Sequence, residues 1–192
     1  MTQTATDTTT ARAFGRRILV WGPSGSGKTT LSRRIGAALG LPVVELDALF
    51  HKPDWQETPD DEFRAIIEER VREHGDGWVF DGNYRVGREV LLPLADRVVW
   101  LRPAFLPTYW RLARRTITRG LRGEELWNGN RESLRLAFLS RHSMLLWGIT
   151  NWRPHVRKVR ESLATIAHAA EVTELRSNRE VEALLAGLGA ET

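Results

Sequence analysis

The segment GPSGSGKT, from Gly22 to Thr29, places three glycines, two serines and one lysine directly after the apolar run ILVW. It fits the pattern G-x-x-x-x-G-K-[ST], in which backbone N–H groups converge on phosphate oxygens. Large side chains would block that approach, and this loop has none. The motif therefore predicts a phosphate cradle, whose residues are Gly22, Pro23, Ser24, Gly25, Ser26, Gly27, Lys28, Thr29 and Thr30.

The side chains that follow the glycines indicate ATP chemistry. We expect the Lys28 ammonium to reach the β and γ phosphates and the Thr29 hydroxyl to hold Mg²⁺. The chain has 25 arginines and three lysines, so a lysine at this position is informative. A second metal-binding residue is predicted at Asp81, which ends the apolar run WVF as an acidic residue does in the Walker B element. ATP and Mg²⁺ are the expected cofactors.

A basic stretch lies in the second half of the chain. Residues 97–160 contain 14 Lys or Arg residues against three acids, although the net charge of the whole chain is only +4. Such a stretch attracts phosphate on a nucleotide, a nucleic acid or a lipid surface, or it forms a solvated helix face. Within it, Arg111, Arg115 and Arg119 are spaced four apart and are expected to line one side of a helix.

Alternating strand and helix patterns must position these groups. Ligands bind at the carboxyl ends of parallel strands, and the candidate residues follow apolar runs, which agrees with a parallel sheet covered on both faces. Trp21, Trp78 and Trp100 lie in strand runs and are expected in the core. Thr58 is expected to cap one helix, and Ser177 with Glu180 another. Strands are predicted near 16–21, 42–46, 78–82, 97–101 and 171–175, and helices near 29–40, 58–75, 84–95, 109–119, 131–147 and 153–169.

The phosphate cradle together with DGNYR, residues 81–85, resembles the adenylate-kinase-like branch of P-loop kinases. The segments LDALFHKPDWQETPDDEF, WVFDGNYR, ADRVVWL and LRSNREVEALL are similar to a small subfamily labelled "DNA topology modulation protein" or AAA-type ATPase. The resemblance extends over most of residues 17–187. It implies a three-layer α/β P-loop NTPase fold in a single domain over 16–190, with a parallel sheet of about five strands, an arginine-rich lid and a helical insertion at about 109–150.

The resemblance also implies roles for particular residues. Arg85 matches the arginine that grips the acceptor phosphate in monophosphate kinases. Arg111, Arg114, Arg115 and Arg119 lie where the lid begins, and Arg115 and Arg119 are expected to stabilise charge on the transferring phosphoryl group.

The sequence does not decide which molecule accepts the γ-phosphate of ATP. An acceptor that is itself a monophosphate needs cationic side chains to bind it, which favours Arg85 and Arg64. A hydroxyl acceptor needs a carboxylate base. Asp47 offers one, because Glu45 and Asp47 resemble the paired acids of shikimate and gluconate kinases. The alternative is that Asp47 caps the segment that follows.

The sequence therefore supports an ATP- and Mg²⁺-dependent phosphotransferase acting on a nucleotide or small metabolite. The alternative is a nucleic-acid-linked P-loop ATPase or regulator that uses the basic stretch 97–160. In that case tryptophans among the arginines would offer stacking platforms for bases. A nucleotide-binding protein without turnover is a third reading, which the intact Lys28 and Thr29 disfavour.

Composition sets the remaining bounds. The 192 residues, 42% of them hydrophobic and 27% charged, suit one globular domain. Because there is no cysteine, disulfides and thiolate metal sites are excluded. The polar residues 1–15 are expected to form a disordered lead without the apolar core of a signal peptide, and no run is long enough to span a membrane. A cytoplasmic protein is expected, and nothing in the sequence indicates its oligomeric state.

Overall fold

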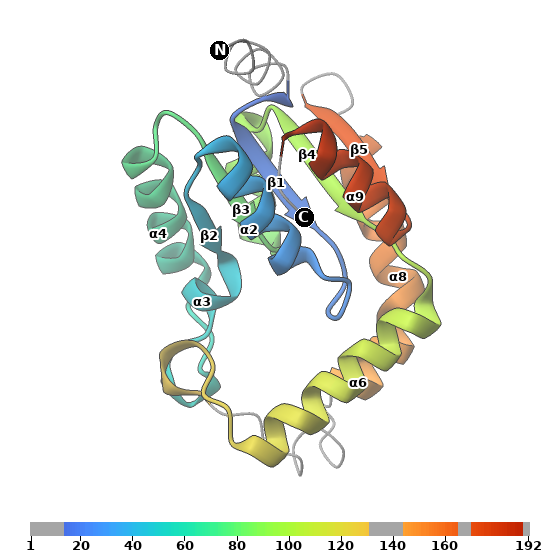
Figure 1. Ribbon diagram of the computed structural model, residues 1–192. Coiled ribbons are helices and arrows are strands. Elements are labelled where there is room, and N and C mark those ends of the chain that lie inside the picture. Colours follow the sequence, from blue (N-terminus) through green and yellow to red (C-terminus); the bar gives the residue numbers. More distant parts are fainter. Residues whose placement is uncertain (1–13, 131–143, 165–169, 190–192) are drawn as a thin grey trace.

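The computed structural model describes residues 14–130, 144–164 and 170–189. Its centre is a parallel sheet of five strands in the order β2-β3-β1-β4-β5 (Figure 1). All five predicted strands are confirmed. They are β1 (Arg17–Trp21), β2 (Val43–Glu45), β3 (Trp78–Asp81), β4 (Arg97–Leu101) and β5 (Glu171–Leu175).

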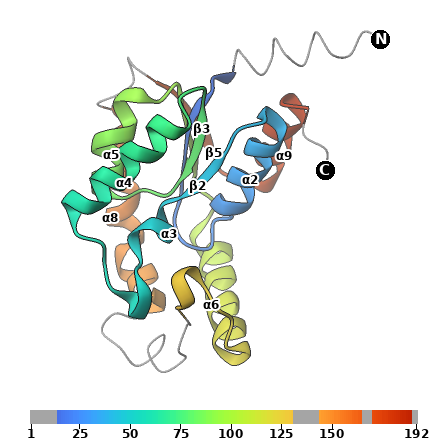
Figure 2. The ribbon, with the colours of Figure 1, turned by 90° about the vertical axis from the view of Figure 1, so that its left-hand side faces the viewer.

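Side chains alternate along each strand, so the sheet has two apolar faces. Leu19 and Trp21 belong to a core shared with α4 (Asp60–Glu73), α5 (Arg85–Leu91) and α8 (Met144–Ala164). Ile18 and Val20 belong to a core shared with α2 (Lys28–Leu39) and α9 (Asn178–Gly187). Figure 2 shows these helices on opposite sides of the sheet. The predicted three-layer α/β P-loop NTPase fold is confirmed.

The three tryptophans of the strands are core residues, as predicted. Trp21, Trp78 and Trp100 are each at most 2% exposed. Trp78 packs edge-on against Phe80, with ring centroids 4.9 Å apart. These large side chains fill the space between the sheet and the helices, so the central strands are held rigidly under the loops that follow them.

The strand order places the loop after β1 at the centre of the sheet. The chain leaves β1 for β2 at one edge, returns to β3, and crosses β1 again to reach β4 and β5. Ligands of parallel sheets bind at such a switch point, outside the carboxyl ends of the strands. The arrangement therefore directs the predicted phosphate cradle to the usual ligand-binding edge.

The helices beyond the sheet correct two predictions. α6 (Phe105–Arg122) begins earlier than the predicted residue 109, because Pro107 lies in its first turn, where a backbone N–H is not needed. α8 runs unbroken through Pro154, so the predicted gap between two helices near residue 150 is wrong. The predicted lead and most of the predicted helix over 131–147 lie outside the described residues.

The capping predictions had different outcomes. Glu180 N–H donates to Ser177 Oγ at the start of α9, as expected. Thr58 does not cap α4, whose N-cap is Pro59. Its hydroxyl donates instead to the carbonyls of Leu49 and Phe50, which end the short helix α3 (Leu46–Phe50). Thr58 thus fastens α3 rather than α4.

Three short 3₁₀ turns complete the described fold: η1 (Pro53–Trp55), η2 (Leu92–Leu94) and η3 (Trp127–Gly129). Within the described ranges, no helix is long and apolar enough to cross a membrane.

Candidate functional site

The loop from Gly22 to Thr29 joins β1 to α2 and has the backbone that an anion site needs. Gly25 and Gly27 have φ of 82° and 95°, a region that L side chains rarely adopt. α2 has no side-chain cap and no acidic residue in its first turn. Its first backbone N–H groups and the positive end of its dipole are therefore available to a phosphate.

The helix α6 packs directly against this loop. A Cβ added to Gly25 would lie 2.7 Å from the Thr108 carbonyl oxygen and 3.0 Å from Leu112 Cβ. Thr108, Leu112 and Thr116 form the buried side of α6. Gly25 is therefore required for close approach as well as for its φ, and the contact holds the arginine-rich helix beside the phosphate cradle.

Thr29 and Asp81, predicted as metal ligands, are in contact. The Thr29 hydroxyl donates to Asp81 Oδ2 at 2.5 Å. Asp81 is only 4% exposed, and its Oδ1 has no hydrogen-bond partner in the part of the chain that the structure describes. Burial raises the pKa of Asp81 to about 6, while the Lys28 charge and the Thr29 hydrogen bond oppose this rise.

A hydroxyl and a carboxylate with a free oxygen fit Mg²⁺. This ion is commonly bound by one or two carboxylates together with substrate phosphates rather than by a complete protein cage. No group of three or more His, Asp or Glu side chains among the described residues is placed to hold a metal. The donor set suits a metal that arrives with a nucleotide.

Asp47 lies beside this pair, on α3 at the carboxyl end of β2. Its Oδ1 accepts a hydrogen bond of 2.6 Å from the Tyr84 hydroxyl. The Tyr84 ring lies against the rings of Phe50 and Phe63, at centroid distances of 4.5 and 5.5 Å. Burial and the neighbouring Asp47 raise the pKa of Tyr84, which therefore stays a hydrogen-bond donor.

Asp47 is thus bound by a side chain from the loop after β3. The N-cap of α3 is Glu45, and no side chain caps this helix. The alternative in which Asp47 serves as a cap is not what the structure shows.

The arginines predicted to clamp an acceptor phosphate lie in a surface network. Arg85 pairs with Asp60 and, at 2.8 Å, with Glu89, and Arg64 also pairs with Glu89. The side chains of Arg85 and Arg64 are 60% and 39% exposed. Since carboxylates hold both guanidinium groups, an acceptor phosphate would have to displace them.

The predicted lid arginines lie along α6, which contains five arginines and no acid. Arg115 and Arg119 are half-buried, and Arg119 Nε lies 3.6 Å from Glu124. Arg111 and Arg114 are exposed. Leu112, which lies against the phosphate loop, is three residues before Arg115 and seven before Arg119 on the same helix.

The sequence reasoning missed a connection between η3 and the segment that carries Glu45 and Asp47. Trp127 Nε1 donates to Glu45 Oε2 at 3.1 Å. Asn128 Nδ2 donates to the carbonyls of Ala48 and His51.

Asn130, which is only 3% exposed, makes a second set of contacts. Its side chain accepts from the Trp55 N–H and donates to the carbonyls of Lys52 and Trp127. These bonds fasten the segment after α6 to α3 and η1, and Figure 1 shows this segment beside α3.

Sequence reasoning also missed Arg88 on α5. Its Nη1 donates to Asn83 Oδ1 at 2.8 Å, in the loop between Asp81 and α5. No pattern in the sequence distinguishes Arg88 from the other arginines among the 25. It stands out only by its partial burial, which the tertiary structure shows.

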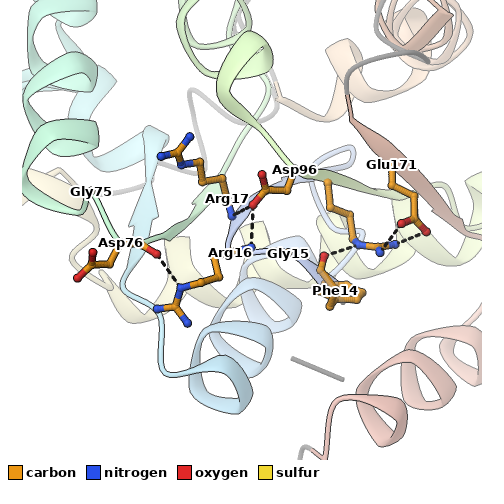
Figure 3. A pocket seen from close by; sticks show the side chains of 9 residues that line it. Phe14, Gly15, Arg16, Arg17, Gly75, Asp76, Asp96 and Glu171 are labelled. Carbon is orange, nitrogen blue, oxygen red and sulfur yellow. Dashed lines mark hydrogen bonds and ion pairs between the residues drawn. The ribbon is translucent and has the colours of Figure 1, made fainter. Parts of the chain in front are cut away.

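A cavity of about 500 Å³ lies at the opposite, amino-terminal edge of the sheet (Figure 3). Asp96 Oδ2 accepts the backbone N–H groups of Arg16 and Arg17 there, and Arg97 pairs with Glu171. These bonds hold the starts of β1, β4 and β5. The phosphate cradle and Asp81 lie at the other end of the same strands, so this cavity is separate from the candidate site.

Comparisons with known proteins find sequence similarity over part of the chain. Residues 18–80 match the family described as "ATPase family associated with various cellular activities (AAA)". A cytidylate kinase of Nitratidesulfovibrio vulgaris strain Hildenborough is 40% identical over 72 residues, which are 36% of this chain and 29% of that protein. The cytidylate kinase of strain DP4 is 39% identical over 72 residues, with the same coverage. The chain thus spans less than a third of the length of these curated relatives.

Two of the similar solved structures cover most of this chain. A gluconokinase from Sinorhizobium meliloti 1021 has 23% identity and a TM-score of 0.49, with 92% of this chain and 93% of that chain covered. A sugar kinase from Janibacter sp. HTCC2649 has 19% identity and a TM-score of 0.47, with 91% and 95% covered.

Proposed function

We propose that this chain is a phosphotransferase that moves the γ-phosphate of ATP to a hydroxyl group of a small molecule. The observation that carries the proposal is Asp81, whose free buried oxygen and contact with Thr29 stand beside an intact phosphate cradle. The similarity to a cytidylate kinase and to the AAA family supports nucleotide chemistry.

The donor side follows from the loop and α2. The backbone of residues 22–30 holds the phosphates of ATP, and Lys28 adds a positive charge at the β and γ phosphates. Thr29 and Asp81 hold Mg²⁺, which when bound neutralises charge on the phosphates. Arg115 and Arg119 stabilise charge on the transferring group, since the protein's contribution to such reactions is mainly positioning and electrostatics.

Asp47 acts as the base on the acceptor side. Its Oδ1 is held by Tyr84, which leaves Oδ2 to accept the proton of the acceptor hydroxyl. The acceptor oxygen forms a bond to the γ phosphorus while the bond from that phosphorus to the β–γ bridging oxygen breaks. The products are ADP, the phosphorylated acceptor and the proton taken by Asp47.

A second acceptor class is a nucleoside monophosphate, which the similarity to cytidylate kinases favours. In that case Arg85 and Arg64 exchange Asp60 and Glu89 for the acceptor phosphate, and Asp47 is not needed as a base. A third outcome, a nucleic-acid-stimulated ATPase, draws on the arginines of α6 and on Trp110, which is 71% exposed.

One assay distinguishes these three candidate functions. ADP release from Mg·ATP is measured with water alone, pooled nucleoside monophosphates, pooled polyols and hydroxy acids, and single-stranded DNA. Lys28→Met serves as the blank for each condition. Turnover with the hydroxyl pool that is lost in Asp47→Asn supports the proposal. Turnover only with monophosphates, retained in Asp47→Asn, selects the second class, and stimulation by DNA alone refutes small-molecule phosphotransfer.

A further inference from the structure

Arg88 is a half-buried cation with an incomplete set of partners. Its one hydrogen bond goes to Asn83, although a guanidinium carries five N–H donors. Arg34, Arg97 and Arg102, three examples of half-buried or buried arginines, each pair with a carboxylate. No ion pair of Arg88 occurs among the described residues, and burial lowers its pKa. No nitrogen of Arg88 is among the fully buried side-chain atoms without a partner, so its remaining N–H donors are open to an anion from outside.

The position of Arg88 directs it to the ligand-binding edge of the sheet. Helical side chains point towards the amino end of their helix, and the start of α5 follows the carboxyl end of β3. The partner Asn83 is two residues beyond Asp81. Tyr84, which holds Asp47, is four residues before Arg88 and therefore lies on the same side of this turn.

The neighbours of Arg88 on α5 make contacts with other elements. Arg85 and Glu89 face α4, where they pair with Asp60 and Arg64. Gly87 lies against Leu46 and Tyr84, so α5 packs closely on the element that carries Asp47. Two hydrogen-bonded pairs, Tyr84–Asp47 and Arg88–Asn83, thus occupy adjacent turns at the acceptor side.

We propose that Arg88, oriented by Asn83, binds an anionic group of the acceptor, so that the substrate is a hydroxy compound that also carries a carboxylate or a phosphate. This inference rests on the proposed function and names its substrate class. Asp47 receives the hydroxyl proton, and Arg88 fixes the other end of the molecule through its remaining N–H donors. A planar guanidinium matches both anions, and two parallel bonds would orient the acceptor as well as hold it.

The test compares probes that share a carbon chain and differ in the neutral, carboxylate or phosphate group at one end. Glycerol, glycerate and glycerol phosphate form one series, and glucitol, gluconate and glucitol phosphate form another. Each is offered as acceptor to the wild type, Arg88→Met, Arg88→Lys and the control Arg72→Met, which alters an exposed arginine of α4. We expect Arg88→Met to raise KM for the anionic acceptor about 10- to 100-fold, with a smaller change in kcat and no change for neutral polyols. Arg88→Lys is expected to recover part of the loss.

Binding without turnover separates this inference from the proposed function. Each probe is added at 10 mM, without ATP, and the midpoint of thermal unfolding is recorded for all four proteins. A rise with an anionic probe that is absent in Arg88→Met supports the anion site even if no phosphotransfer is found. The carboxylate and phosphate arms tell which anion is bound. The proposal is overturned if no anionic probe stabilises the wild type, or if Arg88→Met and Arg72→Met respond alike.

Discussion

Replacing Asp81 by asparagine is expected to stabilise the ligand-free protein at neutral pH while removing its use of Mg²⁺. The carboxylate is buried, and its Oδ1 has no partner among the described residues. Asparagine has nearly the same shape, and its carbonyl oxygen still accepts the Thr29 hydrogen bond. The substitution therefore removes mainly the charge.

The magnitude follows from the pKa. Burial raises the pKa of Asp81 from 3.8 to about 6. Each pKa unit corresponds to 1.36 kcal/mol, so holding this carboxyl ionised costs the fold about 3 kcal/mol. Between these two values the native state binds more protons than the unfolded state, so the contribution of Asp81 to stability falls as pH rises. The stability that the protonated Asp81 carboxyl contributes, relative to its ionised form, is fully present below pH 3.8 and is lost above about pH 6.

The assay is urea unfolding of the wild type and Asp81→Asn at pH values from 3.5 to 8. We expect the two free energies of unfolding to agree near pH 3.5 and to differ by about 3 kcal/mol at pH 8, with the variant more stable. Mg·ADP is expected to stabilise the wild type but not the variant. Asp76→Asn, on an exposed turn, is the control and should remain within about 0.5 kcal/mol of the wild type. A difference independent of pH, or a variant less stable at pH 8, would refute the reasoning.

Three further predictions concern the loop and its supports. Lys28→Met should raise the pKa of Asp81 further, because the Lys28 charge lowers it; a carboxyl ¹³C titration showing no rise would contradict this. Gly25→Ala should lower the free energy of unfolding by about 1–3 kcal/mol, since its φ is 82° and its Cβ would meet the Thr108 carbonyl; an unchanged urea midpoint would count against that packing. Asn130→Ala should cost about 1–3 kcal/mol by removing the side-chain oxygen that accepts the Trp55 N–H, measured in the same way, and a neutral result would show that η3 is not fastened through this amide.

The sequence by itself determined the layers of the fold and the donor half of the site. The alternation of Ile18, Leu19, Val20 and Trp21 assigns successive side chains to opposite faces of the sheet, whatever lies beyond them. The phosphate loop is equally local, because its glycines and its lysine act within eight consecutive residues. Ser177 and Glu180 show the same, since a cap joins residues three apart.

Local signals failed where another element supplied a better partner. Thr58 has the residue type of an N-cap, but its hydroxyl bonds to carbonyls of α3, eight and nine residues earlier. In the predicted helices, Pro107 precedes the one near 109–119 and Pro154 lies at the start of the one near 153–169. The first falls in an opening turn that needs no N–H, and the second lies inside a helix that packs against α6 and the sheet.

Only the tertiary structure decided how the acceptor side is arranged. Asp47 meets Tyr84 across 37 residues, Arg85 meets Asp60 across 25, and Asn130 meets Trp55 across 75. Which carboxylate is left for chemistry and which arginine is left for an anion depends on these pairings, because a charged side chain takes the partner that the packing brings within reach. Strand order sets those distances, and no spacing within the sequence encodes them.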